Sequence, residues 1–199
     1  MRLGILGGTF DPPHVGHLIV ADDAAAALAL DRVTFIPTGT HPLKGTSVEA
    51  PASLRVQMTE AATAGSQLFV VDGRELRRPG PSYTVDTIRE LQDENPDAEL
   101  YLLVGSDILG ELHQWQRMEE IADRARIVVL ERADAPADTY PEDIEMLRIE
   151  VTHVAVSSSE IRERIRTGRP FRYLVPDPVY ALIVEHSLYK EPETRPVHT

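Results

Sequence analysis

Short apolar runs recur along this chain at roughly even intervals, and helix-like stretches separate most of them. The runs cover residues 3–6, 32–37, 68–71, 100–104, 126–130 and 149–156. The helix-like stretches cover residues 15–30, 52–64, 84–94, 115–125, 158–167 and 178–188. Short strands that alternate with helices are typical of a parallel sheet with helices on both faces. We therefore predict an α/β chain with a Rossmann-like, doubly wound parallel sheet.

The length of 199 residues suits one domain with a sizeable core. We expect that domain to cover residues 1–189, with a surface connection at 132–143 and a flexible tail at 190–199. The chain has no cysteine. This excludes disulfides, a thiolate nucleophile and a zinc site with cysteine ligands.

The balance of charge and hydropathy restricts the partners. The formal net charge is −12, which would repel the phosphate backbone of a nucleic acid, so we expect no nucleic-acid partner. No segment approaches the ~18 consecutive apolar residues of a membrane span, and the start of the chain lacks the pattern of a signal peptide. We expect a cytoplasmic protein.

The sequence "GGTFDPPHVGH" at residues 7–17 follows the first apolar run. Gly7 and Gly8 allow a tight turn and a close approach of the backbone to a ligand. Asp11 is a candidate helix cap. His14 and His17 then share one face at the start of a helix, where backbone amides and the helix dipole favour an anion. The combination predicts a phosphate-binding site.

Two other interpretations of this motif are open. It is neither the dinucleotide fingerprint nor the phosphate loop that ends in Gly-Lys-Ser/Thr, so it could be an ordinary glycine turn with two incidental histidines. A metal site with two histidine ligands is the other, although no third ligand lies nearby in the sequence. We predict no protein-held metal.

The sequence "VSSSEIRERI" at residues 156–165 follows the last apolar run. Ser157 and Glu160 fit a capping box, which marks the start of a helix. The hydroxyls of Ser157 and Ser158 and the guanidinium of Arg162 then lie where a phosphate could bind. A capped amphipathic helix with solvated arginines is the alternative.

Gly105 and Asp107 lie in "LLVGSD", at the carboxyl end of the fourth predicted strand. Ligands of doubly wound sheets bind beyond such strand ends, so Asp107 is a candidate acceptor for a ribose hydroxyl, with helix capping as the alternative. Trp115 is the only tryptophan. It is a candidate stacking platform, although a lone tryptophan is more often part of a core.

Thr84 lies in "GPSYTVDTI", where it or Ser82 is expected to cap a helix. Lys44 lies in the glycine- and proline-rich "PTGTHPLKG" that follows the second predicted strand. From that loop its ammonium group could reach phosphates or remain solvated.

Taken together, the motifs resemble the nucleotidyltransferase superfamily. "GGTFDPPHVGH" resembles its H-x-G-H signature, and "SSSEIR" resembles its C-terminal signature. Within the superfamily, "HPLK", "GPSYTVDTI", "LYLLVGSD", "LHQW" and "RYLVPDPVYALIVEHSLY" are similar to the bacterial nicotinate-nucleotide adenylyltransferase family, and the resemblance runs from residue 1 to about 189. The sequence departs from the family pattern at His41, whose role stays open, and at Gln116, where an aromatic residue is common.

The resemblance implies that the chain transfers AMP from ATP to nicotinate mononucleotide, giving nicotinate adenine dinucleotide and pyrophosphate. It implies Mg²⁺ bound to the ATP phosphates. His14, His17, Lys44 and Arg162 would stabilise the reacting phosphates. Groups that bind ATP would come from Gly7, Gly8, Thr9, Phe10, Gly105, Asp107, Ser157 and Ser158, whereas Thr84 and Trp115 would face the nicotinate.

Two further functions remain as alternatives. Pantetheine-phosphate adenylyltransferases share both signatures, although they lack the Ser-Tyr-Thr and Trp segments. A catalytically silent nucleotide-binding sensor is the other, although His14, His17 and Arg162 are all present. The sequence leaves open the preference for nicotinate over nicotinamide mononucleotide and a homo-oligomeric state.

Overall fold

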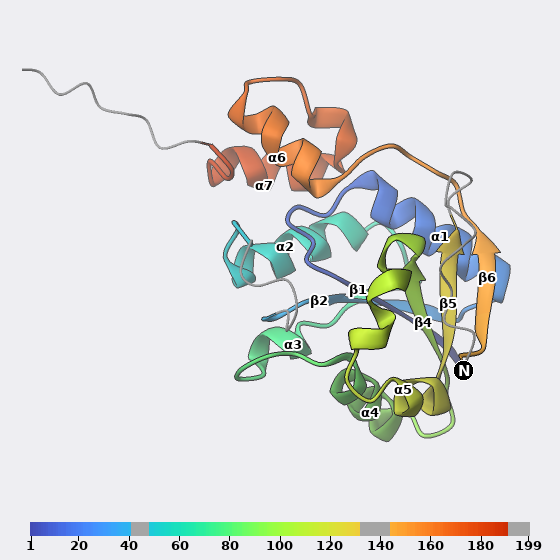
Figure 1. The fold of residues 1–199 in the computed structure, drawn as a ribbon. Helices are drawn as coiled ribbons and strands as arrows, with labels where there is room; N and C mark the ends of the chain where they lie inside the picture. The colour runs from blue at the N-terminus through green and yellow to red at the C-terminus, as the bar shows by residue number, and fades with distance from the viewer. Residues whose placement is uncertain (41–47, 132–143, 191–199) are drawn as a thin grey trace, which may run out of the picture.

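A computed structural model describes residues 1–40, 48–131 and 144–190 and contains one six-stranded, all-parallel sheet (Figure 1). The strand order is β3-β2-β1-β4-β5-β6. The strands are β1 (Arg2–Gly8), β2 (Arg32–Pro37), β3 (Phe69–Val71), β4 (Glu99–Gly105), β5 (Ala125–Glu131) and β6 (Met146–Glu150). The predicted Rossmann-like α/β fold is confirmed.

The strand order reverses between β1 and β4. From β1 the chain moves outward to β2 and β3, and it then returns to place β4 on the other side of β1. Leu6 of β1 pairs with Leu103 of β4, so the ends of these strands lie side by side (Figure 1). This is the switch point at which doubly wound sheets bind ligands.

Within the described ranges there are seven α-helices and two 3₁₀ helices. The α-helices are α1 (Val15–Leu28), α2 (Ala52–Thr63), α3 (Arg74–Arg77), α4 (Thr84–Glu94), α5 (Met118–Arg124), α6 (Ser158–Arg166) and α7 (Asp177–Glu185). The 3₁₀ helices are η1 (Ser106–Gln114) and η2 (Arg172–Leu174). Of these, α6, η2 and α7 follow the last strand.

The side chains of β4 show why both faces of the sheet are covered. Leu100, Leu102 and Val104 pack with apolar residues of α4, α5 and η1. Tyr101 and Leu103 point to the other face and pack with alanines of α1. Successive strand residues point to opposite faces, so a continuous apolar run needs a cover on each side.

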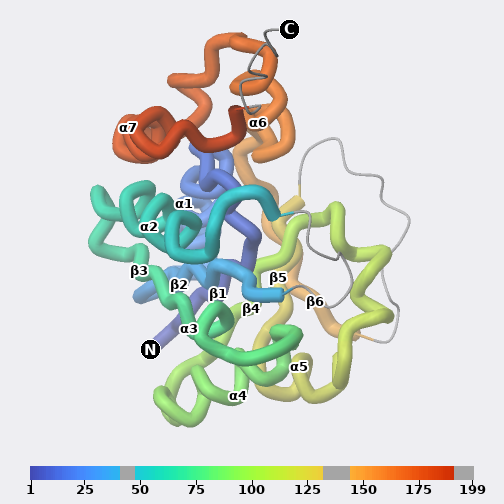
Figure 2. Tube along the Cα trace, turned by 90° about the vertical axis from the view of Figure 1, so that its left-hand side faces the viewer, coloured from blue at the N-terminus to red at the C-terminus, as the bar shows by residue number. Residues whose placement is uncertain are grey.

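A third apolar cluster joins α2, α6 and α7. Met58 of α2, Ile161 of α6 and Ile183 of α7 are fully buried together. In Figure 2, α6 and α7 lie together beyond α1 and α2, on the side away from α4 and α5. The C-terminal helices therefore form a cap over the start of α1.

The sixth strand and the connection after β4 differ from prediction. β6 ends at Glu150, which pairs with Glu131, the last described residue of β5, and the amide of Val151 still donates to the carbonyl of Glu131 at 3.2 Å. The amide of Thr152 instead donates to the carboxylate of Asp23 at 2.6 Å. The predicted strand at 149–156 is wrong beyond Glu150. The predicted helix at 115–125 is present as the shorter α5, and η1 before it was not predicted.

The predicted connection at 132–143 lies outside the described residues, as does all of the predicted tail except Lys190. Within the part of the chain that the structure describes, no helix is both long enough and apolar enough to cross a membrane.

Candidate active site

A cavity of about 500 Å³ opens at the carboxyl ends of β1 and β4. Most of the residues predicted to bind a nucleotide meet there, although they come from distant parts of the sequence. The predicted residues in its wall are Gly7, Gly8, Thr9, His17, Thr84, Gly105, Asp107 and Trp115. Its place at the switch point of the sheet, and a largely apolar wall that carries a few polar groups, are those of a ligand-binding site.

His14 and His17 lie at the start of α1, as predicted. Their rings stack with centroids 3.7 Å apart, and the backbone amide of His14 donates to Nδ1 of His17 at 3.2 Å. Because Nδ1 accepts this bond, the ring proton of His17 is assigned to Nε2. His17 lines the cavity, whereas His14 is buried behind it. His17 is therefore the histidine that can donate to an anion in the cavity.

The glycine turn depends on Phe10, whose ring folds back over it. A Cβ atom on Gly8 would lie 2.9 Å from the Phe10 ring. That ring is buried and makes an edge contact with His17, with centroids 5.0 Å apart. Phe10 does not belong to the cavity wall. Its side chain supports His17, and only its backbone belongs to the turn.

Gly105 and Asp107 form a second part of the wall at the end of β4. A Cβ atom on Gly105 would lie 2.3 Å from Oδ1 of Asp107, so the carboxylate fills the space that a side chain would need. Asp107 is exposed and lies within the first turn of η1, and the N-cap residue of this helix is Gly105. Asp107 is therefore not the helix cap that the alternative interpretation proposed.

A further part of the wall comes from the start of α4 and from the end of η1 with the residues that follow it. Trp115 and Tyr83 are half-buried, pack against the core, and line the cavity beside Thr84. The N-cap residue of α4 is Tyr83, which makes no side-chain cap bond. Ser82 instead donates to the carbonyl of Glu75 at 3.2 Å. The prediction that Ser82 or Thr84 caps this helix was wrong.

Glu75 is a buried acid in the same wall that the sequence analysis missed. Its side chain accepts a hydrogen bond from Thr87 at 2.8 Å. Burial raises the pKa of Glu75, while the bonds from Thr87 and the Gly39 amide and the charge of Arg78 oppose that rise. Nothing in "RELR" distinguishes this glutamate from a solvated one, because its burial depends on the packing of α3 against α4.

Ser157, Ser158 and Arg162 lie on α6, beside the loop that precedes α1. Ser157 caps the helix by accepting from the amide of Glu160 at 3.1 Å, as predicted. Ser158 donates to the carbonyl of Pro12 at 2.8 Å, and Nη1 of Arg162 donates to the carbonyl of Asp11 at 2.8 Å. The two signatures are thus bonded to each other, and these bonds lie outside the cavity wall.

Lys44 and His41 lie outside the described residues.

Asp11 is not the helix cap that the sequence predicted. Its buried carboxylate accepts from the amides of Glu49 and Ala50 at 2.8 and 3.1 Å, and from the hydroxyl of Tyr189 at 2.7 Å. Burial lowers the pKa of Arg55, and the nearby charge of Asp11 acts in the opposite direction. These partners lie 38 to 178 residues away in sequence. Local pattern therefore gave no signal for them.

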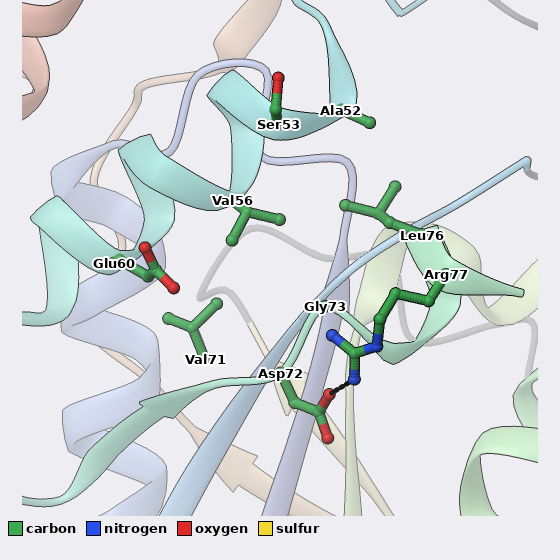
Figure 3. Close-up of a pocket in the computed structure, with 9 residues that line it drawn as sticks. All are labelled: Ala52, Ser53, Val56, Glu60, Val71, Asp72, Gly73, Leu76 and Arg77. Atoms are coloured by element: carbon green, nitrogen blue, oxygen red, sulfur yellow. Dashed lines mark hydrogen bonds and ion pairs between the residues drawn. The ribbon is translucent and has the colours of Figure 1, made fainter.

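A second concavity of about 460 Å³ lies between α2, β3 and α3, as Figure 3 shows. Apolar side chains such as Val56, Val71 and Leu76 line it, together with the ion pair of Asp72 and Arg77. None of the predicted site residues lines it. Across the described ranges, no group of three or more His, Asp or Glu side chains is arranged to hold a metal.

The switch-point cavity, the glycine turn after β1 and the histidine at the start of α1 define a nucleotide-binding protein of the doubly wound α/β class. The model of the family described as "Cytidylyltransferase-like" matches residues 5–164. The chain is 41% identical over 189 residues to "Probable nicotinate-nucleotide adenylyltransferase" of Geobacillus thermodenitrificans, covering 94% of this chain and 86% of that one. It is 43% identical over 195 residues to the protein of the same name from Roseiflexus, covering 94% and 98%.

The chain therefore belongs to the cytidylyltransferase-like family, among the proteins named nicotinate-nucleotide adenylyltransferase. Its fold is also that of the solved "Plasmodium falciparum nicotinic acid mononucleotide adenylyltransferase complexed with NaAD". That comparison has a TM-score of 0.75 at 18% identity and covers 94% of this chain and 97% of the other. The family resemblance seen in the sequence is confirmed.

Proposed function

We propose that this protein joins ATP and nicotinate mononucleotide to give nicotinate adenine dinucleotide and pyrophosphate. The observation that carries the proposal is the single cavity whose wall combines Gly105 and Asp107, Thr84 and Trp115, and His17 beside the glycine turn. One cavity with candidate groups for two nucleosides and for a phosphate is what a dinucleotide requires. The names of the curated relatives support the same reaction.

In the proposed reaction a phosphate oxygen of the mononucleotide attacks the α-phosphorus of ATP. A new P–O bond forms as the bond to the β-phosphate oxygen breaks, and pyrophosphate leaves with that electron pair. The attacking phosphate is already an anion, so no side-chain nucleophile is required. Catalysis then rests on in-line positioning and on stabilising the charge of the α-phosphoryl oxygens.

His17 would donate from Nε2 to an α-phosphoryl oxygen, with the backbone of Gly7, Gly8, Thr9 and Phe10 close to the triphosphate. His14 would keep the His17 ring oriented, since its amide bonds to Nδ1 of His17. Arg162, Ser157 and Ser158 would hold the leaving pyrophosphate from α6, together with Lys44. The adenosine would lie against Gly105 and Asp107, and the pyridine ring against Trp115 and Thr84.

We propose that Mg²⁺ enters as part of the ATP complex. Mg²⁺ keeps several waters and is commonly bound through substrate phosphates and one or two carboxylates. Asp107 is the exposed carboxylate in the cavity wall that could reach its hydration shell. The ion would neutralise charge on the phosphates.

The test is pyrophosphate release from ATP and Mg²⁺ in separate reactions with nicotinate mononucleotide, nicotinamide mononucleotide and phosphopantetheine. We expect release mainly with nicotinate mononucleotide, and a dinucleotide of matching mass. Release with phosphopantetheine alone would assign the chain to the sister activity instead. No release with any acceptor, in a protein that still binds ATP, would favour a silent sensor.

A further inference from the structure

The carboxylate of Glu49 lies between two arginines of α6. Nε of Arg162 donates to Oε1 of Glu49 at 2.8 Å, and Nη2 of Arg166 lies within hydrogen-bond distance of both oxygens of the same carboxylate. Arg162 also bonds to the carbonyl of Asp11, in the loop that leads to His14 and His17. The three side chains therefore form one cluster beside the phosphate-binding signature.

The backbone of Glu49 has an anchor that does not depend on its side chain. Its amide donates to Oδ2 of the buried Asp11 at 2.8 Å. Burial works to raise the pKa of Glu49, but the bonds from Arg166 and Arg162 lower it below its ordinary value, so the side chain is ionised. A change of the side chain that keeps the amide therefore alters the charge of the cluster without removing this anchor.

Two guanidinium groups that converge on one carboxylate form an anion-binding site. Arginine binds carboxylate and phosphate oxygens with the same donor geometry, and bonds between ionised groups are stronger than neutral ones. The Arg162 side chain is only 15% exposed, so its charge is less screened than that of a solvated arginine. A phosphate group carries more charge than a carboxylate and offers more acceptor oxygens.

We propose that Glu49 occupies a phosphate subsite formed by Arg162 and Arg166, and that the terminal phosphates of the substrate must displace its carboxylate. Arg166 thereby becomes a second arginine of the pyrophosphate site. The assignment of a triphosphate to this site rests on the proposed function. Glu49 then acts as an internal competitor. A polyphosphate carries more negative charge than the carboxylate and can displace it. A singly charged anion would only replace one charge with another, so it binds no more strongly than Glu49.

The test is calorimetric binding of inorganic pyrophosphate to the full chain and to Glu49→Gln. Glutamine keeps the size of the side chain and the backbone bond to Asp11 but removes the charge. We expect the dissociation constant to fall about two- to fivefold, the range for losing a partly exposed competing ion pair. Glu160→Gln is the matched control, because it also removes one negative charge from this region but pairs with Arg164 and Arg169.

An unchanged or weaker affinity in Glu49→Gln would overturn the proposal, as would an equal gain in the Glu160→Gln control or no measurable binding in either protein. Arg166→Gln is expected to weaken pyrophosphate binding about threefold or more, and unchanged binding would remove Arg166 from the subsite. This binding measurement does not depend on turnover. Tighter binding in Glu49→Gln, with no pyrophosphate release from any nucleotide pair, would retain the subsite and reject the proposed reaction.

Discussion

His17 has two different hydrogen-bonding atoms, and they separate its structural role from its proposed chemical one. Nδ1 accepts from the amide of His14, and Nε2 carries the proton. Asparagine can reproduce the acceptor but does not reach the position of Nε2. We expect His17→Asn to fold normally and to lose about 100- to 1,000-fold in kcat, the usual effect of one missing donor to a transition state.

Steady-state kinetics with ATP and nicotinate mononucleotide measure this effect. His17→Gln is the companion variant, since its amide nitrogen lies nearer the position of Nε2, and it should recover part of the rate. A His17→Asn enzyme with nearly normal kcat would show that Nε2 is not used in the reaction.

At the residue scale, the sequence predicted the role of a residue where that role depends on residues close to it in the chain. Ser157 caps α6 through Glu160, three positions along the chain, and the pattern was sufficient to find it. Asp11 and Glu75 gave no such signal. Their partners are brought together by the fold, and a carboxyl group with distant partners looks like any other in the sequence.

At the scale of elements, Tyr189 joins the C-terminal cap to the loop that precedes α1. Its hydroxyl donates to Asp11, and burial and the charge of Asp11 raise the pKa of Tyr189, so it stays protonated. We expect Tyr189→Phe to lose about 1–3 kcal/mol of unfolding free energy, because the buried carboxylate loses a donor. Urea unfolding measures the loss. Tyr173→Phe should change nothing, because Tyr173 is 88% exposed, and equal losses in both variants would contradict the assignment.

Helices α4 and α5 are joined by Glu120, which accepts from Nε and Nη2 of Arg89 at 2.6 and 2.8 Å. Hydrogen bonding from Arg89 lowers the pKa of Glu120 to about 2, with further bonding from Arg124. The ionised form therefore stabilises the fold above the ordinary pKa, and this contribution is lost as the pH falls toward 2.

We expect the melting temperature of Glu120→Gln to lie below that of the parent at about pH 7, with the difference shrinking steadily below about pH 4.5. Thermal unfolding across this range measures it. The neighbouring exposed Glu119, changed to Gln, serves as the control. A difference that is constant with pH would show that the charge of Glu120 is not responsible.

A strand that is buried on both faces could be predicted from its continuous apolar run. The limits of β6 and η1 could not be predicted in this way. The continuous apolar run of β4 predicted the central strand to within one or two residues. The predicted strand at 149–156 missed the start of β6 and extended past its end, and η1 was not predicted. The run at 149–156 did not show where pairing with β5 begins and ends, because that depends on a neighbouring strand and not on the local pattern.

For the whole molecule, net charge opposes the proposed substrates. The chain has a formal net charge of −12, and the acidic residues in the cavity wall are Glu75, Asp107 and Glu111. Raising the ionic strength from about 10 to about 150 mM shortens the screening length from roughly 30 to 8 Å. We expect the KM for nicotinate mononucleotide to fall over this range, while binding of uncharged adenosine changes little. A steep rise in KM would show that attraction by basic side chains near the site outweighs the repulsion of the anionic substrate by the net charge.

The most direct measurement is a crystal structure of the protein with nicotinate adenine dinucleotide. We expect one molecule in the switch-point cavity, with adenosine against Gly105 and Asp107, the bridging phosphates at His17, and the pyridine ring on Trp115. A dinucleotide bound outside this cavity, or with its two ends exchanged, would contradict the assignment of the two nucleoside sites.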